Sequence, residues 1–475
     1  MRQICKLSQP VLLVAAILLI SSVSMGWTQD APQDVWSMIR GKATMTFVRV
    51  GGGTLGVLYE PIKPNEKSQI GILVMRSSGN YLTNPVCAYM SIRGYRALCA
   101  NTSAGVGDGG DINMDKVLLN AKAAVTFLRN YPGVRKVLLF GHSEGGSLMT
   151  AYQDIAENGL KACQGPEKIV KCSGKLAGMP PADGVLLISA SWGLSPKLLL
   201  DLDPSVLTMK SGKVRNPDLD QFNPKNGFNA KGSSDYSQEF IHTFLSAEGK
   251  RNNAVVKTAL DRLAAIESGK GDFDDDEPFV VPGSIVSGEN MKLFPQDLSL
   301  MSHTHNPWPL LRNDGSLVTE IVPSVRVTFW PDPRLAENLS PLYGDGAIKT
   351  TVRNFLGTYA IRVTDDYGYD ADSIHGVDWT SSYSSPPGMV EGITAPMLIM
   401  GMTGDTEYLA SEVIFEHATK SADKTLVFVE GGLHHDYSPC TKCEKNPAQF
   451  NNSEKNTYDY LDNWISKKGR FLAAQ

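Results

Sequence analysis

The 475-residue sequence predicts an α/β fold in which a mostly parallel central sheet is covered by helices on both faces. Short, continuously apolar segments, which are typical of fully buried strands, alternate with segments whose apolar residues recur at helical spacing. The alternation runs from about residue 44 to residue 192, stops, and resumes near residue 394. Composition agrees, because 42% hydrophobic and 20% charged residues are the balance of a globular chain.

The first part of the alternation begins with a hairpin. Residues 44–50 and 54–59 read as two strands joined across Gly51, Gly52 and Gly53. A helix is predicted over 114–130 because Val117, Ala121, Leu128 and their neighbours fall on one helical face. The remaining predicted elements of this part are strands at 70–75, 95–100, 137–140 and 185–188 and a helix that starts at Gly145.

The second part of the alternation predicts strands at 397–400 and 425–429 and helices at 409–419 and 458–465. The segment between the two parts is richer in Pro, Asn, Asp and aromatic residues and offers two helices, 238–245 and 253–266. Because both flanks follow one pattern, residues 193–393 are interpreted as an insertion, and 27–192 and 394–475 as two parts of one core.

Residues 1–26 have the pattern of a secretory signal peptide. Arg2 and Lys6 precede an apolar run at 11–20, and small residues follow it. The run is too short for a membrane anchor, which needs ~20 apolar residues. The mature protein is therefore expected to be exported, either to the periplasm or to the medium, and to keep no stable membrane anchor.

Cysteine usage agrees with export. Cys5 lies in the leader, and the other six cysteines are an even number, which points to disulfides in an exported protein. The motif Cys440-Thr-Lys-Cys443 has a second interpretation, as half of a zinc site or as a redox pair, but no second C-x-x-C accompanies it. Nearness in sequence suggests the pairs Cys163–Cys172, Cys440–Cys443 and Cys87–Cys99.

The strongest motif is Gly141-His142-Ser143-Glu144-Gly145, which lies between a predicted strand and a predicted helix. In G-x-S-x-G the serine occupies a tight strand-to-helix turn, where the glycines allow neighbouring backbone to approach. The turn presents the hydroxyl, and the helix N-terminus favours the negative charge that develops in acyl transfer. Ser143 is the predicted nucleophile, and His142 is expected to be a packing residue.

A serine nucleophile needs a base that an acid orients. Asp405 follows the predicted strand 397–400, and His434 follows the predicted strand 425–429. The order Ser, Asp, His along the chain is the one associated with the α/β-hydrolase fold. Glu407 is the alternative acid, and His435 is the alternative base.

On these motifs the chain resembles α/β-hydrolases of the serine esterase/lipase type, over about residues 44–192 and 394–475. The resemblance implies that Ser143 is the nucleophile, His434 the base and Asp405 the acid. Gly-Gly-Leu-His resembles the Gly-x-x-His turn that usually delivers the base, which favours His434 over His435. It also implies that the insertion 193–393 forms a cap over the nucleophile.

The same resemblance implies an oxyanion hole. One donor would be the backbone N–H of Glu144, the residue after the nucleophile. The second would come from the loop after the strand 70–75, which reads Arg76-Ser77-Ser78-Gly79-Asn80 and lacks the usual His-Gly pair. Ser77 is the preferred donor, and Ser78 is the alternative. No cofactor and no metal site are predicted.

Other residues have both a functional and a structural interpretation, and the structural one is favoured. Carboxylates alternate over 272–277 as in calcium loops, but the glycine and the distal glutamate of an EF-hand are missing, which favours a solvated loop. His303 and His305 could place two imidazoles on one strand face. Candidate pocket residues in the insertion, which could equally be core, are Trp308, Trp330, Trp379 and Tyr383.

The predicted function is that of an exported serine hydrolase that cleaves a small carboxylic ester or lactone through an acyl-enzyme. The same triad could instead hydrolyse peptide or carbon–carbon bonds or transfer the acyl group, because one scaffold hosts many chemistries. A non-catalytic binding protein on this fold is the alternative from another class. The net charge of −5 and the absence of a basic patch argue against nucleic acid as a partner. The oligomeric state is not indicated.

Overall fold

The computed structural model describes residues 35–103, 112–284, 293–328 and 347–474, which belong to one compact unit. The predicted leader, residues 1–26, and the candidate pocket residue Trp330 lie outside the described residues. Within the described part of the chain, no helix combines the length and the apolar character that crossing a bilayer requires.

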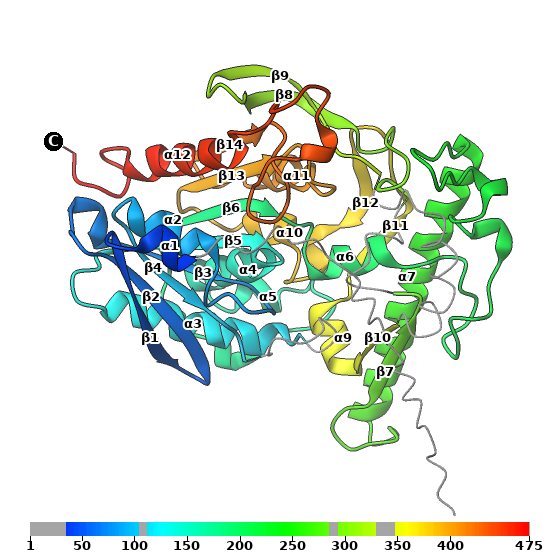
Figure 1. Cartoon of the computed structure of the whole chain (residues 1–475). Helices are drawn as coiled ribbons and strands as arrows, with labels where there is room; N and C mark the ends of the chain where they lie inside the picture. The colour runs from blue at the N-terminus through cyan, green and yellow to red at the C-terminus, as the bar shows by residue number, and fades with distance from the viewer. Residues whose placement is uncertain (1–34, 104–111, 285–292, 329–346, 475) are drawn as a thin grey trace, which may run out of the picture. The chain divides into compact units, whose positions relative to one another are not determined.

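Across the described ranges, the central sheet has ten strands in the order β1-β2-β4-β3-β5-β6-β13-β14-β8-β9 (Figure 1). From β4 to β8 every neighbouring pair is parallel, whereas β1, β2 and β9 run antiparallel to their neighbours. The predicted α/β class with a mostly parallel sheet is confirmed. The bounds of these strands are β1 Ala43–Gly51, β2 Thr54–Pro61, β3 Ile70–Met75, β4 Arg96–Ala100, β5 Lys136–Ser143, β6 Gly184–Ala190, β8 His303–Leu311, β9 Leu317–Pro323, β13 Met397–Met402 and β14 Lys424–Val429.

Helices pack on both faces of this sheet because its central strands are apolar on both sides. In β3, Leu73 belongs to one buried cluster and Val74 to the other, as the two-residue period of a strand requires. Helices α3, α4, α10 and α11 contribute to the first cluster, and α1, α2 and α12 to the second. The bounds of these helices are α1 Val35–Ile39, α2 Pro85–Ile92, α3 Met114–Asn130, α4 Gly145–Asn158, α10 Pro386–Val390, α11 Ala410–His417 and α12 Ser453–Ser466.

The prediction of two helices, 238–245 and 253–266, is wrong in one respect. The structure has a single helix, α7, from Gln238 to Glu267. Gly249 does not interrupt it, because the residue packs against a neighbouring element: a Cβ at Gly249 would lie 3.0 Å from the Tyr367 ring. A glycine inside a helix costs about 1 kcal/mol relative to alanine, and here the close packing accounts for it.

The segment 193–393 does not lie wholly outside the sheet. Strands β8 and β9 come from it and extend the central sheet beyond β14 (Figure 1). Leu310 and Leu311 pair with Phe428 and Val429, and the Glu430 N–H donates to the Leu311 carbonyl at 3.0 Å. The sequence of β8, His-Thr-His-Asn-Pro-Trp-Pro-Leu-Leu, is mostly polar and proline-rich, so it lacks the apolar signature of a buried strand.

The insertion also contributes smaller elements. Two two-stranded antiparallel sheets pair β7 with β10 and β11 with β12. The bounds of these four strands are Pro278–Pro282, Ala347–Thr351, Arg362–Tyr369 and Ile374–Asp378. Among the described residues of this segment, further α-helices are α6, Leu194–Asp201, and α9, Val352–Thr358.

The six cysteines of the core are joined in the three predicted pairs. Cys87–Cys99 links α2 to β4, and Cys163–Cys172 closes the turn after α5, Lys161–Gln164. Cys440–Cys443 lies just after the loop that follows β14. The disulfide interpretation of the C-x-x-C motif is therefore the one that the structure supports.

Candidate active site

Ser143 is the last residue of β5, and α4 begins two residues later. Its φ of 55° lies in the left-handed region, which a non-glycine residue adopts only where the surrounding structure enforces it. A Cβ on Gly141 would lie 2.8 Å from the Gly145 carbonyl oxygen, and one on Gly145 would lie 2.9 Å from the Met75 carbonyl oxygen. The glycines of the motif therefore allow the sharp turn that the sequence predicts.

The loops after β13 and β14 bring Asp405 and His434 together. Nδ1 of His434 lies 2.7 Å from Oδ2 of Asp405. The two loops are also bonded through their backbones, since the Gly404 N–H donates to the Gly432 carbonyl at 2.9 Å. The Gly431 N–H donates to the Thr403 hydroxyl oxygen at 2.8 Å. Parallel neighbouring strands end at the same edge of the sheet, which explains why residues far apart in sequence meet here.

Three donors converge on the Asp405 carboxylate, which is 4% exposed. Oδ2 lies near Nδ1 of His434 and accepts a hydrogen bond from the Ser189 hydroxyl at 2.7 Å. Oδ1 accepts one from the Glu407 N–H at 3.1 Å. Burial raises the pKa of Asp405, but His434, the Glu407 N–H and the Ser189 hydroxyl outweigh it and hold the pKa well below its usual range. The ionised carboxylate keeps the hydrogen of the His434 imidazole on Nδ1.

His142 connects the serine turn to the loop that carries His434. One ring nitrogen, Nε2, donates to the His434 carbonyl at 2.7 Å, and the other, Nδ1, lies 2.9 Å from the Tyr81 hydroxyl. A carbonyl only accepts, so the hydrogen is on Nε2, and Nδ1 accepts from Tyr81. Burial, together with His434 and His435, lowers the pKa of His142 well below its usual value, so the ring is neutral. His142 does more than pack: it is hydrogen-bonded to the backbone of His434 and so ties that loop to the serine turn.

An ion pair joins the serine turn to the loop after β3. Arg76 donates from Nε at 3.0 Å and from Nη2 at 2.9 Å to one oxygen of Glu144, and the Ser77 hydroxyl lies 3.4 Å from the same oxygen. Burial raises the pKa of Glu144, but Arg76 and then Lys197 outweigh it, so that the pKa is lowered. The two residues predicted to supply oxyanion donors, Glu144 and Ser77, are thus held side by side.

Three histidines cluster at this edge of the sheet. One ring nitrogen from each of His142, His434 and His435 lies within 4.8 Å of the others. Both nitrogens of His142 already have hydrogen-bond partners, and Nδ1 of His434 bonds to Asp405. A metal ion bound by all three would have to displace the His142 bonds, so the cluster does not fit a metal centre as it stands.

The described pocket candidates of the insertion have contacts with residues other than Ser143, Asp405 and His434. Trp379 stacks on Trp192 with ring centroids 6.0 Å apart, the Tyr383 hydroxyl donates to Asp115, and the Trp308 indole donates to Glu412. The Trp308 indole and the Tyr383 hydroxyl thus have hydrogen-bond partners within the protein, as is usual for buried aromatic residues.

The acidic run 272–277 and the histidines of β8 also have oppositely charged or polar side chains close by. Arg262 donates to both carboxylate oxygens of Glu277 at 2.7 Å. His303 and His305 face Asp372, with Nδ1–Oδ2 distances of 4.0 and 3.4 Å.

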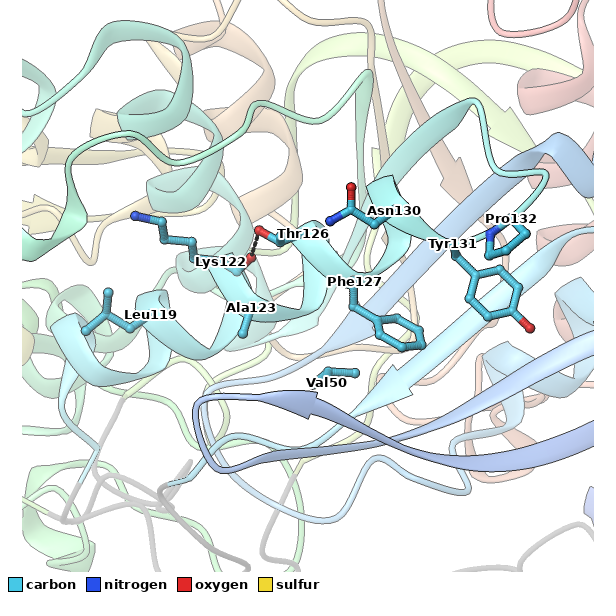
Figure 2. Close-up of a pocket in the computed structure, with 9 residues that line it drawn as sticks. All are labelled: Val50, Leu119, Lys122, Ala123, Thr126, Phe127, Asn130, Tyr131 and Pro132. Atoms are coloured by element: carbon cyan, nitrogen blue, oxygen red, sulfur yellow. Dashed lines mark hydrogen bonds between the residues drawn. The ribbon is translucent and has the colours of Figure 1, made fainter.

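A groove lies on the outer face of α3. Figure 2 shows Phe127 over Val50, with Leu119 and Ala123 further along the same helix. None of the residues that line the groove belongs to the Ser143 region. The groove therefore has no part in the site.

Sequence reasoning did not assign a role to Ser189, Arg76 or Tyr81. Ser189 and Arg76 share one signal, because each is a polar residue at the carboxyl end of a buried strand, β6 or β3. Loops at that end of a parallel sheet build most sites in α/β proteins. Tyr81 carries no comparable signal, since only the folded loop brings it to His142.

Comparison with known proteins shows distant structural likeness and no sequence relative. No protein-family model matches the chain, and no curated protein matches its sequence. Carboxyl esterase 2 from the mycorrhizal fungus Tuber melanosporum is 12% identical, with a TM-score of 0.38 over 90% of this chain and 87% of that chain. An alpha/beta hydrolase superfamily protein from Enterococcus faecalis is 12% identical, with a TM-score of 0.37 over 90% and 99%. Esterase B from Lactobacillus rhamnosis is 11% identical, with a TM-score of 0.35 over 90% and 88%. No activity is inferred from likenesses this distant.

Proposed function

From the α/β-hydrolase fold of this chain, we propose that it is a serine hydrolase that cleaves a small carboxylic ester or lactone through an acyl-enzyme. One observation carries the proposal: the His434 side chain is hydrogen-bonded to Asp405, and the His434 carbonyl is hydrogen-bonded to His142, the neighbour of Ser143. The left-handed turn at Ser143 supports it, because strain of this kind is characteristic of a nucleophile on a strand-to-helix elbow.

In the proposed mechanism Ser143 Oγ attacks the ester carbonyl while His434 takes its proton. Asp405 keeps the His434 hydrogen on Nδ1 and stabilises the imidazolium that forms. The N–H groups of Glu144 and Ser77 are proposed to bind the oxyanion, each donor being typically worth ~3 kcal/mol of transition-state stabilisation. His434 then returns the proton to the leaving alcohol, and a water activated by His434 releases the acid.

A small substrate is proposed because the nucleophile is enclosed. Ser143 is 5% exposed, and the side chain of His434 is 18% exposed. The ends of the insertion pack against α4 just behind the nucleophile: the Leu194 N–H donates to the Ser147 hydroxyl oxygen at 3.1 Å. These contacts support the proposal that part of 193–393 serves as a cap, with the hairpin 303–323 excepted because it belongs to the sheet.

The proposal is tested by fluorophosphonate labelling of the mature protein, read by intact mass. We expect one adduct on the wild type and none on Ser143→Ala. Ser421→Ala is the matched control, because this serine is also buried and its hydroxyl donates to the Ala395 carbonyl. If the Ser421→Ala variant and the wild type both stay unlabelled while folded, the non-catalytic binding protein becomes the better interpretation.

A substrate panel separates the remaining chemistries. We expect hydrolysis of short acyl esters or lactones and no turnover of matched amides or diketones by the wild type, with no turnover by Ser143→Ala. Turnover of the amides or diketones instead would move the proposal to peptide or carbon–carbon bond hydrolysis on the same triad. An acyl ester formed with an added alcohol would indicate acyl transfer.

Export is part of the same proposal. The leader pattern of residues 1–26 supports it, and so do the three cysteine pairs, since disulfides persist in oxidising compartments. The mass of the protein recovered from the periplasm or the medium should correspond to cleavage near residues 24–26. Recovery of full-length protein from the cytoplasm alone would contradict export.

A further inference from the structure

Ser189 meets the acid–base pair from a strand that carries no member of the proposed triad. Its hydroxyl lies 2.7 Å from Oδ2 of Asp405 and 3.2 Å from Nδ1 of His434. We propose that Ser189 is a positioning residue of the proposed reaction, whose hydroxyl fixes the Asp405 carboxylate against His434. This inference rests on the proposed function and adds a fourth residue to it.

The backbone of β6 aims this hydroxyl. His142 pairs with Ile188 and Ser143 pairs with Ala190, so Ser189 is the extra residue of a bulge in the β5–β6 ladder. A bulge redirects the side chain of the inserted residue. Ser189 has a φ of 49° and is 1% exposed. A non-glycine residue in this conformation costs of order 1–3 kcal/mol, and the orientation of its hydroxyl is what the strained conformation provides.

The donors and acceptors have one consistent arrangement. Nδ1 of His434 carries its hydrogen, so it cannot accept from Ser189. The Ser189 hydroxyl therefore donates to Oδ2 of Asp405, the same oxygen that Nδ1 of His434 contacts. The Glu407 N–H holds Oδ1 on the other side. With both oxygens bonded, the carboxylate plane cannot turn away from the imidazole.

A positioning role has a consequence that a purely structural hydrogen bond lacks. The Ser189 hydroxyl lowers the pKa of Asp405, because it stabilises the ionised carboxylate. Without this hydroxyl, the full charge of Oδ2 acts on His434 and favours the imidazolium. The pH at which His434 gains its second hydrogen, and so stops acting as a base, should then rise.

The test uses the rate of fluorophosphonate labelling as a function of pH, which requires no knowledge of the substrate. Ser189→Ala removes the hydroxyl. Ser189→Gly also removes it, but introduces a residue that adopts a positive φ without strain. We expect both variants to be labelled about tenfold more slowly than the wild type, as for the loss of one hydrogen bond to a charged group. We also expect the acidic limb of their rate profile to move to higher pH.

The matched control is Ser421→Ala. Ser421 is also buried and donates one hydrogen bond, at 2.8 Å to the Ala395 carbonyl, before β14 begins. We expect its labelling rate and pH profile to equal those of the wild type. Thermal unfolding of every variant distinguishes slow labelling from loss of fold.

A transplanted acid gives a second test. Because the Ser189 hydroxyl lies 3.2 Å from Nδ1 of His434, a carboxylate at this position can reach the imidazole. Ser189→Asp in an Asp405→Ala background should restore labelling at least tenfold over Asp405→Ala alone. A remote structural serine would give no such rescue.

The outcomes separate this inference from the proposed function. A folded wild type that is not labelled at Ser143 overturns the proposed function and this inference together. A labelled wild type whose Ser189→Ala and Ser189→Gly variants keep its rate and its pH profile overturns the inference alone. Equal slowing in Ser421→Ala would also overturn it, because the effect would then not depend on contact with Asp405.

Discussion

Two regions of the molecule place histidine beside aspartate, and they differ in the distance between the two side chains and in their exposure to solvent. At the end of β13 and β14, His434 Nδ1 lies 2.7 Å from Asp405, whose side chain is 3% exposed. On β8, His303 and His305 lie 4.0 and 3.4 Å from Asp372, with the two histidine side chains 40% and 63% exposed. Asp405 also accepts hydrogen bonds from the Ser189 hydroxyl and the Glu407 N–H.

The difference shows that nearness of histidine to aspartate does not by itself make a catalytic pair. In the buried region the aspartate is fixed by further donors, and the interaction acts through a medium of low dielectric constant. On β8 the pair is screened by water, and such exposed ion pairs contribute about 0–1 kcal/mol. The same residue types therefore predict catalysis in one place and a solvated surface in the other.

Asp405→Asn should have the largest effect on the labelling rate, because it removes the buried carboxylate that distinguishes the two regions. The amide can hydrogen-bond His434 in the wrong tautomer, which should lower the labelling rate about 10⁴-fold. The fold should persist, because the substitution preserves shape. Rates of fluorophosphonate labelling and circular dichroism spectra measure the two effects. If the Asp405→Asn variant retained about a tenth of the wild-type rate, the role given to this carboxylate would be contradicted.

Arg76→Met should have the next largest effect. It leaves the buried Glu144 carboxylate without the cation that is hydrogen-bonded to it, so we expect a loss of about 2 kcal/mol of stability. The labelling rate should fall about 10–100-fold, because the residues proposed to supply the oxyanion donors, Glu144 and Ser77, lose the ion pair that holds their two loops together. Glu144→Gln is the control: combined with Arg76→Met, it should add less to the stability loss than it costs alone, because the two residues interact directly. Additive losses would disprove the coupling.

The pH dependence of stability tests the environment of His142. Its pKa in the folded state is below the unfolded value of about 6.5, so the unfolded chain binds more protons as the pH falls below that value. The stabilisation is fully present above pH 6.5 and is lost on acidification toward the folded-state pKa. We expect the melting temperature of the wild type to fall between pH 7 and pH 5, with a shallower decline for His142→Gln. His305→Gln, at an exposed site, should keep the wild-type slope.

The smallest effect is expected on β8. Asp372→Asn removes the carboxylate that faces His303 and His305, yet exposed pairs of this kind contribute about 0–1 kcal/mol. The labelling rate should stay within twofold of the wild type, and the melting temperature should hardly move. A large loss of labelling would mean that the β8 histidines act on the site, and the contrast between the two regions would no longer hold.

The sequence predicted the parts of the molecule that repeat a simple pattern. The strand 70–75 and the helix 114–130 match the structure, because a continuous apolar run indicates a fully buried strand and apolar residues at helical spacing indicate the buried face of a helix. Ser143, Asp405 and His434 were predicted because each lies at or just after the carboxyl end of a strand of the parallel sheet. Their chemical roles stay predictions until labelling is measured.

The features that could not be predicted from the sequence depend on tertiary contacts. The role of Ser189 follows from a one-residue bulge in β6, and no periodicity reports a bulge. Strands β8 and β9 were missed because an edge hairpin can be polar and can contain proline. Two helices were predicted where the structure has the single helix α7, and the packing of Gly249 against Tyr367 is a tertiary contact that no helical period reports.

The place of β14 in the sheet has a consequence for the order in which the chain can mature. It is the last strand in sequence, yet it lies between β13 and the much earlier β8. Pairings between segments this far apart close late, because a long loop must be ordered first. The histidine loop follows β14 directly, so docking of this strand also delivers His434 to the serine turn. A chain still emerging from the ribosome therefore carries the proposed nucleophile before the proposed base, and the proposed reaction requires the completed sheet.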